Sequence, residues 1–160
     1  MGDRIHSYHL QVVWTGNLGA DTATHAAYAR DHIIQGDGKP PIDGSSDPAF
    51  RGDPARWNPE ELLLASISAC HKLWYLGLCA KAGIRVVAYR DAAEGTMTED
   101  ADGGGRFTQA VLRPRITLRA DSDQARAERL HQDAHRLCFI ANSVNFPIRV
   151  EPVFEIPADP

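Results

Sequence analysis

Polar and apolar residues alternate at the start of the chain, and this pattern predicts strands. The alternation runs roughly from Ser7 to Trp14, and Thr15-Gly16-Asn17 then supplies a turn, so a strand is expected to lead into a hairpin. The segment from Thr22 to Ile34 is expected to add two more short strands. Between residues 36 and 57, four glycines and four prolines interrupt every period, and one long loop is expected there.

A long apolar segment follows, and it predicts the central helix. Asn58 can cap the first free N–H groups, Pro59 is tolerated at the first helical position, and the two glutamates that follow suit the positive end of the helix dipole. The helix is expected to run from Pro59 to about Ala82 and to stop at Gly83. Residues 62–80 are apolar on most sides, which is typical of a helix inside a protein or in a subunit interface.

The second half of the chain is expected to contain strands, one more helix and a last strand. The strands are expected at residues 85–94, 95–99, 107–112 and 115–120, a helix from Gln124 to about Ile140 capped by Ser122 or Asp123, and a strand from Asn145 to Phe154. The consecutive glycines at 103–105 join two strands and no Gly-Lys-Ser/Thr follows, which favours a hairpin tip over a phosphate loop. This order of elements predicts a single α+β domain over residues 1–160.

Length and charge narrow the classes of function. The chain has 160 residues, and its 17 basic and 21 acidic side chains give a formal net charge of −4. Without a basic block it offers no electrostatic footprint for nucleic acid or an anionic membrane. The first residues lack a signal-peptide core, and no uninterrupted apolar run approaches the roughly 20 residues of a membrane span. We therefore expect a soluble, cytoplasmic protein with neither a nucleic acid nor a membrane as its partner.

The three cysteines are the first candidates for chemistry. Cys70, Cys79 and Cys138 are too few and too widely spaced for a disulfide scaffold, which favours reduced thiols. Cys79 follows Cys70 by nine positions and so lies on the opposite side of the helix, where we interpret it as a small buried hydrophobe. Cys70 lies at the midpoint of the apolar helix with His71 beside it. Its position alone fits either a reactive or a buried structural thiol.

The end of the second helix offers an alternative, a metal site. His131 and His135 are four residues apart and Cys138 is three further on, so all three could project on one face as ligands. A solvated helix face or a capping hydrogen bond is the commoner role of such histidines. Because no second cysteine or carboxylate stands at ligand spacing, we predict no metal site.

Two segments resemble the OsmC and organic hydroperoxide resistance (Ohr) family. Residues 58–70, Asn-Pro-Glu-Glu-Leu-Leu-Leu-Ala-Ser-Ile-Ser-Ala-Cys, resemble the helix that begins Asn-Pro-Glu in that family and carries its reactive cysteine ten residues after the Glu. Residues 134–143, Ala-His-Arg-Leu-Cys-Phe-Ile-Ala-Asn-Ser, look like the family's segment with the resolving cysteine. The resemblance covers almost the whole chain. It implies an OsmC-like α+β fold with antiparallel sheets, a long buried central helix and an intertwined homodimer with active sites at the interface.

The resemblance also implies a function and the residues that perform it. It implies a thiol peroxidase, without haem or another bound cofactor, that reduces organic hydroperoxides to alcohols. Carried over by position, the expected catalytic residues are the peroxidatic Cys70, the resolving Cys138, the carboxylate Glu60 and the arginine Arg51. Arg30 and Arg56 are alternatives for the arginine. Phe139 departs from the family, which usually has Pro after the second cysteine.

The expected chemistry gives each of these residues a task. Cys70 attacks the peroxide and becomes a sulfenic acid, and Cys138 condenses with it into a disulfide that an external dithiol, such as a dihydrolipoyl group, reduces. An arginine can lower the pKa of the attacking thiol, whereas Glu60 alone would raise it and is expected to orient the arginine. About 15 Å of straight helix separates Glu60 from Cys70. If two such helices cross antiparallel near residue 65, Glu60 of one chain approaches Cys70 of the other.

A second function stays open at this point. Fold does not determine function, and the chain could be an OsmC-fold protein without peroxidase activity that binds a small apolar ligand at the dimer interface. Phe139 and His71 leave room for this alternative. The apolar helix face around Cys70, with Trp74, favours an organic hydroperoxide over hydrogen peroxide as substrate.

Overall fold

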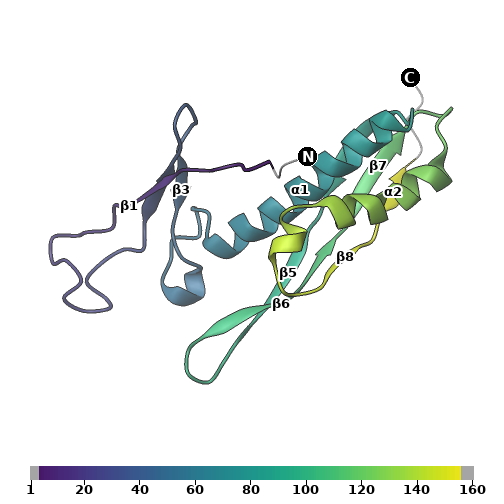
Figure 1. The fold of residues 1–160 in the computed structure, drawn as a ribbon. Coiled ribbons are helices and arrows are strands. Elements are labelled where there is room, and N and C mark those ends of the chain that lie inside the picture. The colour runs from purple at the N-terminus through teal and green to yellow at the C-terminus, as the bar shows by residue number, and fades with distance from the viewer. Residues whose placement is uncertain (1–3, 156–160) are drawn as a thin grey trace. The chain divides into compact units, whose positions relative to one another are not determined.

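The computed structural model describes residues 4–155, and the chain divides into two compact units at residue 62. The first unit holds a three-stranded antiparallel sheet in the order β1 (Gln11–Trp14), β2 (His32–Gln35) and β3 (Ile42–Gly44), followed by the short helix η1 (Pro48–Phe50). Figure 1 shows these elements at the purple and blue end of the chain.

The strand predictions for the first unit are partly wrong. The strand expected from Ser7 is confirmed only in its second half, β1, and the two strands expected between residues 22 and 34 are a single strand, β2. The long loop expected at 36–57 contains β3 and η1. Strand β3 has only three residues, too few to show a period, and it forms because Ile42 pairs with Ile34 across the antiparallel ladder.

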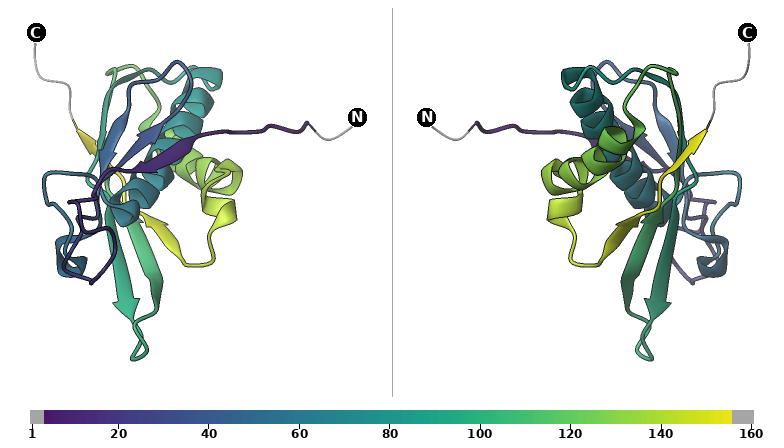
Figure 2. Two further views of the ribbon diagram at one scale, coloured as in Figure 1. Left: turned by 90° about the vertical axis from the view of Figure 1, so that its left-hand side faces the viewer. Right: turned by 90° about the vertical axis from the view of Figure 1, so that its right-hand side faces the viewer.

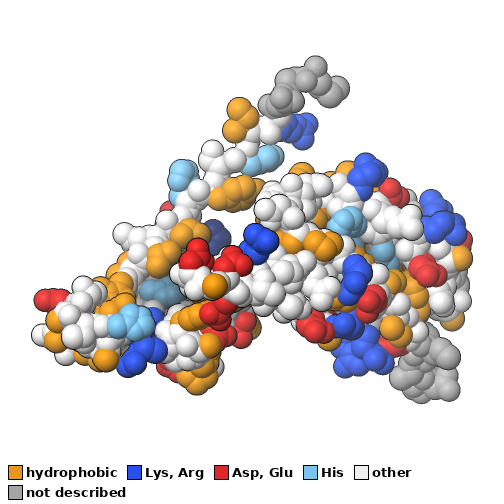
Figure 3. All heavy atoms as spheres, turned by 90° about the horizontal axis from the view of Figure 1, so that it is seen from below, with side chains coloured by type: hydrophobic (Ala, Val, Ile, Leu, Met, Phe, Trp, Pro, Cys, Tyr) orange, Lys and Arg blue, Asp and Glu red, His pale blue; other side chains and the backbone are white. Residues whose placement is uncertain are grey.

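No hydrophobic side chain is buried among residues 4–62. Val12 is 57% exposed, Trp14 44% and Ile42 39%, and Figure 3 shows hydrophobic side chains uncovered on this unit. A three-stranded sheet needs a covered hydrophobic face for independent stability. The first unit therefore lacks a hydrophobic core of its own.

Helix α1 (Pro59–Lys81) begins and ends where the sequence predicts. Asn58 and Glu61 form a reciprocal capping box, in which the Glu61 N–H donates to Asn58 Oδ1 at 2.8 Å and the Asn58 N–H donates to Glu61 Oε2 at 3.1 Å. After the last turn, Gly83 adopts φ of 75°, a left-handed conformation that favours glycine.

Only one stripe of α1 is buried within a single chain. Its four buried residues are one turn apart: Ile67, His71, Tyr75 and Cys79. Of the most apolar stretch of α1, 22% is buried. The expected long buried helix is thus buried on one side only. By length and composition alone α1 could cross a membrane, a criterion that the core helix of a soluble protein also meets.

The second unit contains two three-stranded sheets. One has the order β4 (Val86–Asp91), β7 (Pro114–Leu118), β9 (Val153–Glu155), and the other β5 (Glu94–Glu99), β6 (Gly105–Leu112), β8 (Ile148–Val150). The pairs β4–β7 and β5–β6 are antiparallel, and β5 and β6 form the expected glycine-tipped hairpin. The last two strands, however, are parallel to their neighbours β6 and β7, so the expectation of antiparallel sheets is wrong there.

The final strand expected from Asn145 to Phe154 is in fact the two short strands β8 and β9. Pro152 lies between them and has no N–H to donate to a ladder, so pairing is interrupted where the chain passes from one sheet to the other. Strand β6 also passes almost directly into β7. The segment β8–β9 therefore runs parallel to the segment β6–β7, with β8 paired to β6 in one sheet and β9 paired to β7 in the other.

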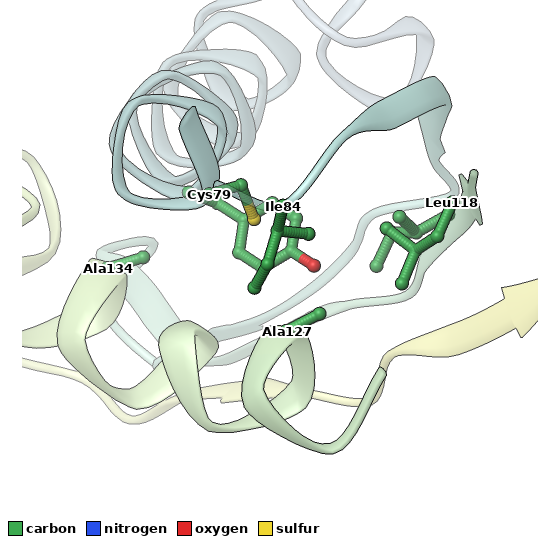
Figure 4. Packing of buried hydrophobic residues seen from close by; sticks show 7 residues of the cluster. Cys79, Ile84, Leu118, Ala127 and Ala134 are labelled. Carbon is green, nitrogen blue, oxygen red and sulfur yellow. The ribbon is translucent and has the colours of Figure 1, made fainter. Parts of the chain in front are cut away.

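Helix α2 (Gln124–Leu137) completes the second unit and its core. Asp123 caps the helix by accepting the N–H of Arg126 at 2.9 Å, and the helix ends one turn earlier than expected. Figure 2 shows both helices on the same side of the strands of this unit. In Figure 4, Ala127 and Ala134 of α2 face α1 across the hydrophobic core. The buried residues of this core are Tyr75, Cys79, Ile84, Ile116, Leu118, Ala127 and Ala134.

Candidate functional site

The fold of the second unit brings Cys70 and Cys138 together. Cys70 lies in the middle of α1 and is partly exposed, whereas Cys138 follows the last residue of α2 and is 0% exposed. Both are free thiols, and Cys70 lies close enough to Cys138 to contribute to the raised pKa of the Cys138 thiol. Cys70 is thus the more accessible of two neighbouring thiols, and Cys138 lies buried beside it.

The backbone around Cys138 explains how its thiol is held. Its ψ of 112° takes the chain out of the helix, and its own N–H donates to the carbonyl oxygen of His135. The N–H of Ala141 donates to Cys138 Sγ at 3.4 Å. Burial, with a further contribution from neighbouring Cys70, raises the pKa of Cys138 to about 11. Cys138 is therefore protonated at neutral pH.

An aromatic pair lies beside the two cysteines. Trp74 is one turn after Cys70 on α1, and Phe139 directly follows Cys138. The two rings meet edge to face, with centroids 5.7 Å apart and planes at 81°. Phe139 is nevertheless 68% exposed. The sequence singled out Phe139 only as a departure from a family pattern, and the structure shows that it adds an apolar surface at the cysteine pair.

Two of the three candidate arginines in the first unit are held by other groups. Arg30 donates to backbone carbonyl oxygens at 2.6 and 2.8 Å, and its guanidinium lies 4.2 Å from the ring centre of Tyr28. Arg56 forms ion pairs with three aspartates: Asp31, Asp43 and Asp53.

The remaining arginine, Arg51, is exposed at the end of η1, where it has φ of 67°. Its side chain makes no ion pair with the residues that the structure describes. Glu60 lies in the first turn of α1, and its Oε2 is buried without a hydrogen-bond partner in the described part of the chain. An unpartnered buried carboxylate oxygen is costly, so Glu60 needs a donor from elsewhere.

The second unit contains a hydrogen bond between two buried histidines, His71 and His131, that the sequence did not predict. His71 Nε2 and His131 Nδ1 are 2.9 Å apart, and both side chains are almost completely buried. The ring of Tyr75 stacks on His131 with centroids 3.9 Å apart and planes at 10°. The solvated role favoured for His131 is thus wrong. The sequence did contain one indication that these histidines are buried, since each lies on an apolar helix face. His71 shares its face with Ile67 and Tyr75 in α1, and His131 shares its face with Ala127 and Ala134 in α2.

Burial keeps both histidines neutral. It lowers the pKa of His71 to about 4, with a further contribution from nearby His135, and it lowers the pKa of His131 to about 3, with a further contribution from His71. A neutral pair has one proton in the N–H···N bridge. The outer nitrogens, His71 Nδ1 and His131 Nε2, are buried without a hydrogen-bond partner among the described residues.

The alternative metal site is not assembled in residues 4–155. No three His, Cys, Asp or Glu side chains are arranged there to hold a metal ion. His131 instead forms a hydrogen bond with His71, and Cys138 is buried beside Cys70 as a free thiol.

Cys79 takes no part in this arrangement. It is buried in the core between α1 and α2, as interpreted from the sequence (Figure 4), and burial raises the pKa of its thiol. A buried, protonated thiol is chemically inert.

Comparisons with known proteins agree with the order and geometry of these elements. Residues 52–153 match the family model described as OsmC-like protein. An OsmC-like protein of unknown function from Vibrio cholerae is 31% identical, with a TM-score of 0.83 over 93% of this chain and 100% of that one. None of the curated proteins matches the sequence.

Two further solved structures share the fold at lower identity. The organic hydroperoxide resistance protein OsmC of Legionella pneumophila is 17% identical, with a TM-score of 0.68 over 96% of this chain and 99% of that one. The organic hydroperoxide resistance protein OhrB of Bacillus subtilis is 20% identical, with a TM-score of 0.60 over 92% and 98%.

Proposed function

This chain belongs to the OsmC-like protein family, and from that premise we propose that it is a thiol-dependent peroxidase that reduces organic hydroperoxides to alcohols. The observation that carries the proposal is the adjacent pair of a partly exposed thiol, Cys70, and a fully buried one, Cys138. Two organic hydroperoxide resistance proteins share the fold. The aromatic surface of Trp74 and Phe139 suits the apolar part of an organic substrate.

The proposed cycle has three steps. The Cys70 thiolate attacks one peroxide oxygen, the O–O bond breaks, and the other oxygen leaves as an alkoxide that takes up a proton to become the alcohol. Cys138 then attacks the Cys70 sulfenic acid, forming the S–S bond and releasing water. An external dithiol, such as a dihydrolipoyl group, reduces the disulfide by two thiol exchanges and is itself oxidised. The proposed cycle uses no bound cofactor, and its need for reduced thiols favours a reducing compartment such as the cytoplasm.

Arg51 and Glu60 complete the proposed site. A guanidinium beside Cys70 would stabilise the thiolate. Among the three arginines considered, Arg51 is the one whose side chain makes neither an ion pair nor a hydrogen bond with the described residues, which favours it over Arg30 and Arg56. The unpartnered Oε2 of Glu60 suits a carboxylate that orients this guanidinium.

A second copy of the chain is the proposed partner. The first unit buries no hydrophobic side chain among residues 4–62, and α1 leaves Leu73 66% exposed. Lys72 lies near the middle of α1, where a charge is expensive in lipid, so protein is a better cover for this helix than a membrane. An intertwined homodimer would cover both surfaces and could bring Glu60 of one chain to Cys70 of the other.

Replacing the exposed Leu73 of α1 by glutamate is expected to weaken the dimer strongly, because a charge would be buried in an apolar interface. Sedimentation analysis should show the wild type at twice the chain mass of 17.6 kDa and L73E as a monomer or an aggregate. A125E, on the exposed side of α2, is the matched control and should remain dimeric. A wild-type monomer that turns over peroxide would contradict the shared site.

The peroxidase proposal predicts a specific disulfide. When the reduced protein is treated with cumene hydroperoxide, mass spectrometry should find one Cys70–Cys138 disulfide per chain, with Cys79 still a thiol and the peroxide consumed. C79S should behave identically, because Cys79 is buried away from the pair. If Cys70 and Cys138 stay reduced while the peroxide persists, the proposal fails, and an OsmC-fold protein that binds a small apolar ligand at the dimer interface becomes the better reading.

A further inference from the structure

The buried histidine pair joins the same two helices that carry Cys70 and Cys138. His71 is the residue after Cys70 on α1, and His131 lies seven residues, nearly two full turns, before Cys138 and so on the same face of α2. The imidazole planes are parallel within 6° and their centroids are 5.2 Å apart, too far for face-to-face contact. The rings therefore lie edge to edge, with the hydrogen bond in their common plane.

Stability alone does not account for this pair. Each ring keeps one buried nitrogen without a partner among residues 4–155, and an unsatisfied buried polar atom costs free energy. Two apolar side chains of similar size would avoid that cost. A hydrogen bond does, however, restrict distance and angle far more tightly than apolar contact does. The pair thus has the properties of a geometric restraint between α1 and α2.

The step that depends most on such a restraint is disulfide formation. The two sulfurs must approach to about 2 Å with a narrow range of dihedral angle. Because Cys138 is buried and protonated at neutral pH, little of it is thiolate, and its reaction must rely on being held in position. Attack on peroxide, in contrast, uses the accessible Cys70 alone.

We propose that His71 and His131 are positioning residues for the resolving step: their hydrogen bond sets α1 against α2 so that Cys138 is aligned with the Cys70 sulfenic acid. This inference rests on the proposed function. In the step concerned, the Cys138 sulfur forms the S–S bond, the S–O bond of Cys70 breaks, and the hydroxyl leaves with the Cys138 proton as water.

The test replaces one imidazole while keeping its ring stack. His131→Phe preserves an aromatic ring for Tyr75 but removes the hydrogen bond, and His131→Asn restores a polar atom near the position of Nδ1. His135→Phe, one turn further along α2 and without a side-chain hydrogen bond in the described chain, is the matched control. After one equivalent of cumene hydroperoxide, each variant is sampled over time for sulfenic acid, trapped with dimedone, and for disulfide.

H131F should consume peroxide at the wild-type rate but form the disulfide about tenfold more slowly or worse, with sulfenic acid accumulating. H131N should recover most of the rate, and H135F should match the wild type. Disulfide formation at the wild-type rate in H131F would overturn the inference, and so would a parallel fall of both steps. Should H131F fail to fold, H71L and H71Q give the same comparison from the other side of the hydrogen bond.

A second measurement separates this inference from the peroxidase proposal. Equilibration of the Cys70–Cys138 pair with reduced and oxidised glutathione gives the effective concentration of the two thiols without any peroxide. It should fall about tenfold or more in H131F and recover in H131N. If the wild type does not reduce peroxide but this pattern is found, only the proposed function fails. An unchanged effective concentration in H131F would overturn the positioning role itself.

Discussion

Replacing Cys70 with serine is expected to reduce peroxide turnover more than about a thousandfold, because the serine hydroxyl is a far weaker nucleophile than a thiolate. Cys70 is the member of the thiol pair that a peroxide can reach, since Cys138 is fully buried beside it. Consumption of cumene hydroperoxide, measured with an excess of dithiol reductant, is the direct assay.

The other two cysteines supply the comparison for C70S. Without added reductant, C138S should still consume about one equivalent of peroxide per chain and accumulate a Cys70 sulfenic acid, because the first step does not need Cys138. C79S should keep wild-type turnover, since Cys79 lies in the core between α1 and α2. Substantial turnover by C70S, or loss of turnover in C79S alone, would show that the nucleophile has been misassigned.

The free energy of unfolding should fall steeply as the pH drops from 6.5 toward 4. The folded-state pKa values of His71 and His131, about 4 and about 3, lie below the ordinary value of 6.5. Between these values the unfolded chain binds protons that the folded chain does not, so acid favours unfolding. Above pH 6.5 the neutral pair is fully compatible with the fold. Two such histidines give a loss of about 3 to 4 kcal/mol between pH 7 and pH 5.

Urea unfolding at pH 7, 6 and 5, at one fixed protein concentration, measures this loss. The double variant H71F/H131F should lose much less stability over the same interval, because it has no buried imidazole to protonate and leaves no unpaired ring nitrogen. The difference between the two proteins isolates the histidine pair from the carboxylates, which both proteins share. An equal loss in the two proteins would mean that the pair does not titrate as described.

The sequence predicted the helices well because their ends carry strong local preferences. Asn58, Glu61 and Gly83 bound α1 by capping chemistry that depends on the nearest residues only. The strands of the first unit were harder to predict, since β3 has three residues and depends on pairing with β2. The parallel strands β8 and β9 depend on β6 and β7, which lie about 40 residues earlier in the chain.

The site shows the same division. The resemblance to a family pointed to Cys70 and Cys138, and the structure brings them into contact. It could not point to the bond between His71 and His131, because a contact between residues 60 positions apart arises only when α1 packs on α2. In the same way, the sequence shows Phe139 only as a departure from the family motif, whereas the structure shows that its ring packs against Trp74.

The late position of β8 and β9 in the chain has a consequence for synthesis. Both sheets of the second unit receive their third strand from residues 148–155, so β6 and β7 each keep one unpaired edge until these residues have left the ribosome. An unpaired strand edge is a template for pairing with other chains. The nascent protein is therefore prone to aggregation until this segment emerges, and a variant that lacks the segment would keep both edges unpaired permanently.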